Sequence, residues 1–287
     1  MDIILEAINE WMKAMLVDGI MGSLTGIFDT MNDEVASIAT NVGMTPSQWN
    51  SGVFTMIQNL SDAVILPIAG MILTFIMCYE LIQMVMERNN FHDFETFTIF
   101  KWMFKTCIAV MIVTNTFSIV MAIFDVAQSV IQNAAGVIST STSVSVDSMS
   151  NLQSTLESME VGALLGLYLQ SFVLGFVMKA LGICVFIIIY GRMLEIYLMT
   201  SLAAIPLSTM GNREWNIGQN YIKSLCALGF QGFLIMVCIG IYAILIQSIS
   251  TSGDPIDAIW TCLMYTILLC FALFKTGSLA KSIFSAH

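Results

Sequence analysis

Five long runs of this sequence carry no charged side chain, and these runs constrain its fold more than any other feature. They are Ala63–Tyr79, Thr106–Phe124, Val161–Met178, Ser224–Gly253 and Ala258–Phe274. A helix needs about 20 mostly apolar residues to cross the hydrocarbon core of a bilayer, which is about 30 Å thick. Each run is long enough or nearly so, and only 10% of all residues are charged, against about 25% in soluble domains. The sequence therefore predicts an all-α, polytopic helical membrane protein.

The basic residues predict how the chain is oriented, because loops rich in Lys and Arg stay in the cytoplasm. The chain has only ten of them, and none lies between Thr106 and Met178. Most of the others cluster around three segments, with Arg88, Lys101 and Lys105 in the first, Arg213 and Lys223 in the second, and Lys275 and Lys281 in the third. We expect these segments inside, and the N-terminal region and residues 125–160 and 250–257 outside. The prediction is a multi-pass protein of the cytoplasmic membrane with its N-terminus outside and its C-terminus inside.

Termini on opposite sides require an odd number of crossings. We expect about five transmembrane helices, near residues 63–86, 102–124, 161–190, 221–249 and 257–274. Residues 192–210 are then an interfacial or re-entrant segment on the cytoplasmic side, broken at Pro206, because proline removes a backbone donor and disfavours a helical residue before it. The sequence divides into an extracytoplasmic amphipathic region (1–62), a first transmembrane helix pair (63–124), an extracytoplasmic Ser-rich loop (125–160) and a transmembrane core with a cytoplasmic C-terminal tail (161–287).

The N-terminal region shows a two-faced helical pattern over residues 2–28. Apolar residues recur at Ile4, Ile8, Trp11 and Met15, and the opposite face carries Asp2, Glu6, Glu10 and Lys13. This pattern is typical of a helix that lies on a membrane surface or against a partner helix. Thr45-Pro46 is typical of a helix start, and we expect a bend at Pro67. The Ser-rich segment 138–158 is interpreted as a flexible spacer or as a partner contact.

Four charged residues interrupt the apolar segments, and the sequence leaves alternatives open for each. Only twelve residues separate Lys179 from Arg192, which is about 18–20 Å of helix and less than the hydrocarbon thickness. We therefore place Arg192 near the cytoplasmic headgroups, paired with Glu195 one turn on, and Lys179 within the membrane. Arg192 and Glu195 form an interface anchor, the charged rim of a pore, or a docking site. Lys179 pairs with an acid, with Glu80 as one candidate, or faces a wet lumen or a subunit interface. The other role for Glu80 is an interface anchor.

The remaining polar residues predict no chemistry. Asn115 and Gln231 are expected to be buried amides with structural partners. The seven cysteines lie inside apolar segments without a CxxC pair, and the sequence contains no GxxxxGK[ST], HExxH or GxSxG motif. A formal net charge of −10 argues against stable, direct nucleic-acid binding, which needs clustered Lys and Arg. We expect no catalytic, cofactor-binding or metal-binding residues, no cofactor and no enzymatic activity.

Four longer segments are distinctive together: LSDAVILPIAGMILTFIMCYELIQM (60–84), YGRMLEIYLMTSLAAIPLSTMGNREW (190–215), SLCALGFQGFLIMVCIGIYA (224–243) and LFKTGSLAKSIF (273–284). They resemble the TrbL-type conjugal transfer proteins of Gram-positive conjugative elements, the polytopic inner-membrane subunit of type IV secretion systems. The resemblance implies a membrane channel or scaffold subunit, without catalytic residues, that helps move single-stranded DNA with its relaxase across the cytoplasmic membrane. It also implies a homo-oligomer in the lipid bilayer, with other type IV secretion membrane subunits and their ATPases as partners. Contact with the relaxase-linked DNA would be transient at most.

Two other classes of function stay open at this point. A solute or ion transporter or channel could use Lys179, Glu80 and the Arg192/Glu195 segment as a polar pathway, although no inverted repeat is visible in the sequence. A holin-like or purely structural membrane protein is the third class.

Overall fold

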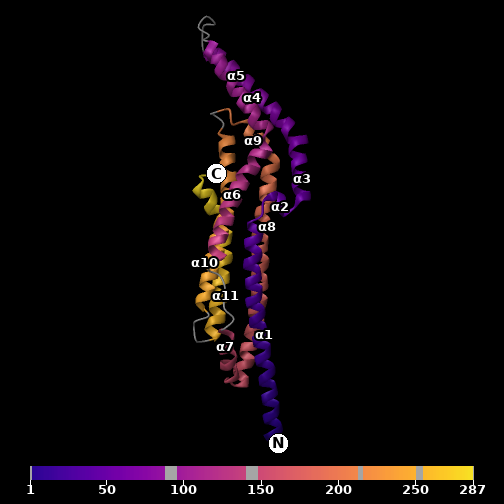
Figure 1. The fold of residues 1–287 in the computed structure, drawn as a ribbon, viewed down its shortest axis with the longest axis vertical. Helices are drawn as coiled ribbons and strands as arrows, with labels where there is room; N and C mark the ends of the chain where they lie inside the picture. The colour runs from indigo at the N-terminus through magenta and orange to yellow at the C-terminus, as the bar shows by residue number, and fades with distance from the viewer. Residues whose placement is uncertain (1, 88–95, 140–147, 213–215, 250–254, 287) are drawn as a thin grey trace. The chain divides into compact units, whose positions relative to one another are not determined.

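The computed structural model describes residues 2–87, 96–139, 148–212, 216–249 and 255–286, and within these ranges its regular elements are all helices (Figure 1). In chain order they are α1 (Asp2–Val42), α2 (Pro46–Trp49), α3 (Ser51–Leu60), the π-helical η1 (Ser61–Ile65), α4 (Leu66–Glu87), α5 (Thr96–Thr114), α6 (Thr116–Ser139), α7 (Ser148–Glu157), α8 (Val161–Leu202), α9 (Ala204–Ser208), α10 (Ile217–Ile249) and α11 (Pro255–Ile283). The predicted all-α, polytopic class is confirmed.

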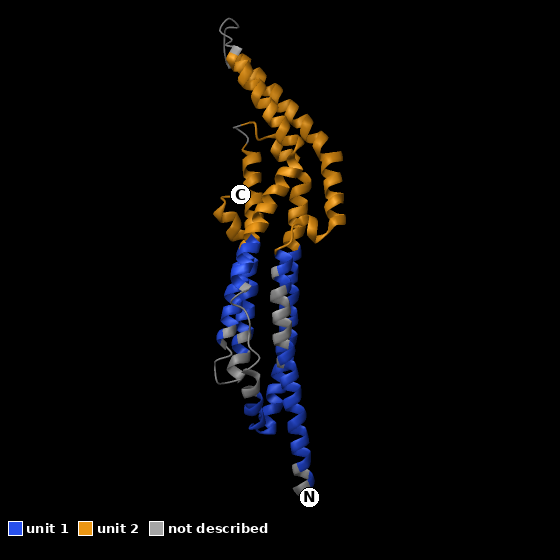
Figure 2. Cartoon of the chain, in the orientation of Figure 1, with its two compact units in different colours: residues 1–42, 131–190, 234–276 blue, residues 43–130, 191–233, 277–287 orange. Residues whose placement is uncertain are grey.

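The chain forms two compact units, each built from three separate segments (Figure 2). Unit 1 consists of residues 1–42, 131–190 and 234–276, and unit 2 of residues 43–130, 191–233 and 277–287. Helices α6, α8, α10 and α11 each contribute to both units. The division into four consecutive regions that the sequence suggested stays a prediction.

In unit 1, α1 packs against α7 and the first turns of α8. The buried cluster contains Leu16, Val17, Ile20, Leu156, Leu164 and Leu167. A Cβ added at Gly19 would lie only 2.7 Å from Cε2 of Tyr168, so the missing side chain lets α8 approach α1 closely. The predicted stripe of Ile4, Ile8, Trp11 and Met15 is exposed, and the buried residues of α1 lie on the opposite side of the helix.

Unit 2 has two buried clusters. One joins α3, α6, α8 and α10 through Ile57, Val120, Phe124, Met193, Ile196, Tyr197, Ala203, Leu225 and Leu228. The other joins η1, α4, α5 and α9 through Ile65, Ala69, Leu73, Ile76, Met77, Ala109, Val113 and Ala204. These clusters hold the helices that carry most of the charged residues considered below.

Two local features follow the predicted backbone chemistry. Thr45 is the N-cap of α2: its hydroxyl accepts from the N–H of Gln48, and the Gln48 side chain accepts from the N–H of Thr45. Pro67 follows a π-helical turn, in which the N–H of Leu66 donates to the carbonyl of Ser61. Proline clashes with the carbonyl four residues earlier in a regular helix, and the wider turn at 61–65 relieves that clash. The expected helix start at Thr45-Pro46 is confirmed.

Six helical stretches in the described residues are long and apolar enough to cross a membrane, one more than the five predicted. The extra one arises because the expected helix 102–124 is interrupted at Asn115, between α5 and α6. Across this point the N–H of Asn115 donates to Met111 and the N–H of Ile119 donates to Asn115. Both bonds reach back four residues, as in an α-helix, so the chain continues through Asn115 without reversing. α5 and α6 therefore continue as one rod, and the five crossings that the basic residues predicted stay a prediction.

The structure differs from the sequence prediction at two helix ends. α8 continues for 42 residues to Leu202, about 63 Å at 1.5 Å per residue, so residues 192–202 belong to it and only the five residues of α9 around Pro206 are separate. The Ser-rich segment also contains a helix, because α7 occupies residues 148–157 and contacts α1. Residues 140–147 of that segment lie outside the described residues.

Candidate functional site

Arg192 is the most unusual charged residue of unit 2, because it is only 6% exposed. Its Nε donates to the carbonyl oxygen of Leu228 at 3.3 Å and its Nη2 to that of Gly229 at 3.4 Å, both on α10. A Cβ added at Gly229 would lie 2.9 Å from the Cβ of Ala127, so α6 also touches α10 at this turn. Burying a charge is costly unless polar groups surround it. Here, carbonyl dipoles rather than a carboxylate solvate the guanidinium, among the residues that the structure describes.

Glu195 does not pair with Arg192, so that prediction is wrong. Its Oε1 lies 3.3 Å from Nζ of Lys281 on α11, and the two side chains are 44% and 52% exposed. The reason is the helix geometry: Arg192 lies on the face of α8 that is buried against α10, and Glu195 lies at the accessible edge. An exposed pair of this kind contributes about 0–1 kcal/mol. It ties the C-terminal part of α11 to α8 only weakly.

Glu80 forms the more buried ion pair of unit 2. Its two carboxylate oxygens lie 2.6 and 2.7 Å from Nζ of Lys105, and the side chains of Glu80 and Lys105 are 15% and 39% exposed. Close by, Nε1 of Trp102 donates to the carbonyl of Met77. These contacts hold α4, which precedes residues 88–95, against α5, which follows them. The candidate pairing of Glu80 with Lys179 is therefore replaced by one with Lys105.

Lys179 is exposed on α8 in unit 1, and no ion pair of its side chain is found within the described ranges. The same helix stripe carries Phe172, Phe176 and Ile183, which are 71%, 73% and 61% exposed. A cation amid exposed apolar side chains is costly in lipid. The prediction that this residue faces another helix, a wet lumen or a subunit interface stays a prediction.

The two amides differ from each other. Asn115 is exposed and its Nδ2 donates to the carbonyl of Met111 in the preceding turn, so the expectation of a buried amide is wrong there. The side chain can stay exposed because the Met111 carbonyl and the Thr114 hydroxyl, both on the preceding turn, accept from its amide. Gln231 is 9% exposed, and a Cβ added at Gly277 of α11 would lie 3.3 Å from its Nε2. The buried amide predicted at Gln231 is confirmed, in a close contact of α10 with α11.

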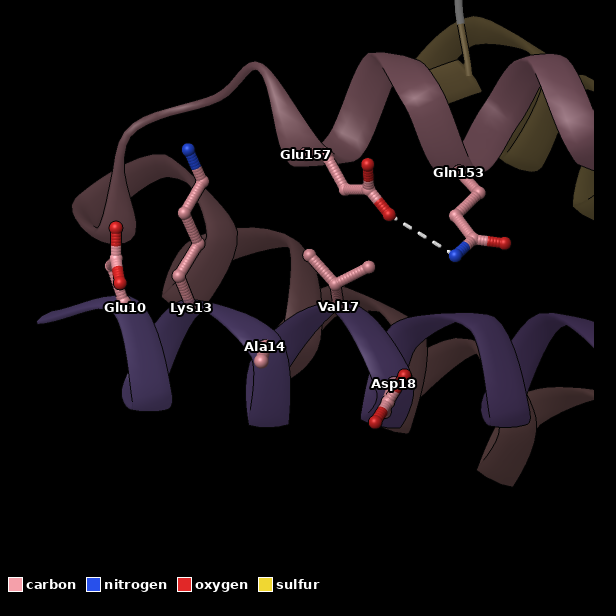
Figure 3. Close-up of a pocket in the computed structure, with 7 residues that line it drawn as sticks. All are labelled: Glu10, Lys13, Ala14, Val17, Asp18, Gln153 and Glu157. Atoms are coloured by element: carbon pink, nitrogen blue, oxygen red, sulfur yellow. Dashed lines mark hydrogen bonds between the residues drawn. The ribbon is translucent and has the colours of Figure 1, made fainter. Parts of the chain in front are cut away.

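A small pocket of about 250 Å³ lies between α1 and α7 in unit 1 (Figure 3). Glu10, Lys13 and Asp18 of α1 and Gln153 and Glu157 of α7 line it, and Nε2 of Gln153 donates to Oε1 of Glu157 at 3.1 Å. Among the described residues, no group of three His, Cys, Asp or Glu side chains is placed to hold a metal ion. Ala14 and Val17 also line this groove at the junction of two helices, and no chemistry is assigned to it.

The sequence was compared with models of known protein families. The model of the TrbL/VirB6 plasmid conjugal transfer like proteins matches residues 31–204, which is more than half of the chain. The chain belongs to this family. Searches of curated proteins and of solved structures find no match. The resemblance to TrbL-type proteins is thus confirmed.

The region shared with the TrbL/VirB6 family contains five of the six candidate polar residues, namely Glu80, Asn115, Lys179, Arg192 and Glu195. Gln231 and Lys281, on α10 and α11, lie beyond it. Sequence reasoning missed the partners of the charged residues, Lys105 and Lys281, which are 25 and 86 positions away from Glu80 and Glu195. It also missed that Ser118, Asp125 and Ser129 are exposed on one side of α6, which their spacing of seven and four residues could have revealed.

Proposed function

We propose that this TrbL/VirB6-like chain is a channel or scaffold subunit of a type IV secretion machine for conjugation. In this role it helps to move single-stranded DNA with its relaxase across the cytoplasmic membrane. The family match over residues 31–204 supports the assignment, together with the six helical stretches of the described residues that are long and apolar enough to cross a bilayer. Its partners are other membrane subunits of the machine, further copies of the chain, and separate ATPases that supply the energy.

The charge distribution supports a passive part in this transport. The chain has a formal net charge of −10, so it offers little attraction to the phosphates of DNA. Seven of its ten basic residues belong to unit 2, namely Arg88, Lys101, Lys105, Arg192, Arg213, Lys223 and Lys281. By the positive-inside rule these residues favour the cytoplasmic side. The proposed orientation therefore keeps the N-terminus outside and the C-terminus inside.

The alternative of a solute or ion transporter receives less support. In a transporter, Glu80 and Lys179 would form parts of one polar pathway. Both carboxylate oxygens of Glu80, however, accept hydrogen bonds from Lys105. The ion pair between α4 and α5 then serves as a structural contact of two membrane helices.

An in-frame deletion in a donor strain tests the proposed function. We expect transfer frequency to fall to the background of a transfer-deficient donor and to return when the full chain is supplied in trans. Nicking of the transfer origin by the relaxase should continue in the deletion strain, because the chain acts at the membrane step. Unchanged transfer frequency in the deletion strain would show that the assignment is wrong.

A further inference from the structure

One side of α1 is apolar and exposed near the N-terminal end of the helix. Ile4, Ile8, Trp11 and Met15 recur at helical spacing and are 67%, 50%, 66% and 56% exposed. These four residues, here called the α1 stripe, extend over about 17 Å of helix. Residues 7–11 are exposed on every side of the helix, so the described part of unit 1 does not cover the stripe there. A contiguous row of large apolar side chains in this state is typical of an interaction surface.

The geometry of α1 argues against lipid as the cover. α1 is not among the six helical stretches of the described residues that could cross a membrane. It runs in the same direction as α8, with Gly19 beside Tyr168 (Figure 1), so most of the stripe lies beyond Val161, the first residue of α8. A helix that rests on a bilayer surface lies in the membrane plane. α1 instead follows the axis of a helix that is long and apolar enough to cross the membrane.

The charge of α1 also argues against anionic lipid. The helix carries one lysine, Lys13, and seven acidic residues, namely Asp2, Glu6, Glu10, Asp18, Asp29, Asp33 and Glu34. Such a helix repels anionic headgroups, and it repels the α1 of a second copy for the same reason. It attracts a partner that carries Lys and Arg.

The groove between α1 and α7 places exposed carboxylates beside the stripe (Figure 3). Glu10, Asp18 and Glu157 line it together with Lys13, and no ion pair of these three acids is found within the described residues. Asp18 is seven residues after Trp11 and therefore lies on the same side of the helix. The apolar stripe and the acidic groove thus form one continuous surface.

We propose that the α1 stripe and this groove dock a helix of another protein, one whose apolar side is flanked by Lys and Arg. The apolar side of the partner covers Ile8, Trp11 and Met15, and its basic side chains reach the carboxylates of Asp18 and Glu157. Apolar anchors supply affinity in this mode of recognition, and the charges select the partner. The inference rests on the proposed function for the presence of other subunits, but it depends neither on DNA transfer nor on which side of the membrane α1 lies.

Binding of two synthetic peptides to the full chain in phosphatidylcholine nanodiscs tests the proposal. Both peptides form amphipathic helices with the same leucine side, and one is flanked by lysines and the other by glutamates. By fluorescence anisotropy, with binding to empty nanodiscs subtracted, we expect the lysine peptide to bind at least about tenfold more tightly. Ile8→Ser combined with Trp11→Ser should weaken its binding about tenfold or more. Asp18→Lys combined with Glu157→Lys should abolish the preference for lysine.

The matched control is Asp62→Lys combined with Asp125→Lys. It makes the same change of net charge on exposed acids of unit 2 and should leave binding of the lysine peptide unchanged. Equal binding of both peptides to the wild-type chain would overturn the proposal. So would a control variant that loses as much binding as the groove variant, because bulk charge would then explain the preference.

Photo-cross-linking in the donor strain, with benzoylphenylalanine at position 11, identifies the natural occupant. We expect an adduct with another protein whose cross-linked segment contains more Lys and Arg than Asp and Glu. An adduct with a second copy of this chain, or the absence of any protein adduct, would overturn the proposal. Transfer frequency is measured separately. A deletion strain that still transfers DNA removes the proposed function and leaves the peptide preference, whereas equal binding of both peptides removes the docking surface and leaves the function.

Discussion

The hydroxyl of Tyr197 on α8 binds the first helix of unit 2, α2, and Tyr197→Phe removes only that hydroxyl oxygen. The hydroxyl donates to the carbonyl of Pro46 at 2.6 Å, and the ring lies 5.8 Å from that of Trp49. Tyr197 is 3% exposed and Pro46 is buried. The substitution keeps the ring and leaves the buried carbonyl without this donor. The loss of free energy of unfolding should be about 1–3 kcal/mol, the cost of one buried group that loses its partner.

Reversible unfolding of the purified chain by SDS in mixed micelles measures this change. Tyr79→Phe is the matched control, because Tyr79 is exposed and bonds only to Gln83 on its own helix in the described structure; we expect less than about 0.5 kcal/mol there. Tyr197→Leu also removes the aromatic contact and should cost about 0.5–1.5 kcal/mol more than Tyr197→Phe. If Tyr197→Phe is as stable as Tyr79→Phe, α2 is not docked on α8 as described.

Three further substitutions test other contacts. Glu80→Lys and Lys105→Glu should each lower the amount of chain in the membrane while the double exchange restores it, with a coupling free energy of about 0.5–3 kcal/mol; additive losses would show that the pair is not formed. Gly229→Val should separate α6 from α10 and lower the stability in detergent by about 1–3 kcal/mol, because the new Cβ would lie 2.9 Å from the Cβ of Ala127. The control Gly166→Val should change the stability little, because the space at its Cβ is open. Lys179→Ala should reduce transfer or assembly if its side chain meets a partner or a wet lumen, and wild-type transfer with normal assembly would indicate a lysine that only reaches the headgroups.

The fold class could be predicted from the sequence because it depends on composition and run length. Uncharged runs such as Thr106–Phe124 have few alternatives to a membrane helix. The start at Thr45 was also visible, since an N-cap and its proline are adjacent in the chain. Local rules of this kind need no knowledge of which helices meet.

Helix ends and charge partners could not be predicted, because they depend on contacts between distant segments. The charge of Arg192 suggested a position at the membrane interface. Instead, α8 packs on α10 so that the Arg192 side chain is buried and donates to two backbone carbonyls of α10. Glu195 is closer in sequence to Arg192 than to Lys281, yet it faces the edge where α11 ends. Asp125 was assigned to an outside loop, since nothing in the sequence shows that the helix continues past it to Ser139. Asn115 interrupts one helix without ending it, which only the backbone bonds on both sides reveal.

The membrane topology is tested most directly by reporter fusions in the natural host. Alkaline phosphatase and a cytoplasmic fluorescent protein are fused in turn after Ser158, after Gly211 and after the C-terminal residue. Five crossings with an outside N-terminus predict phosphatase activity at 158 and fluorescence at 211 and at the C-terminus. Fluorescence at 158, or phosphatase activity at the C-terminus, would contradict both the proposed orientation and the five proposed crossings.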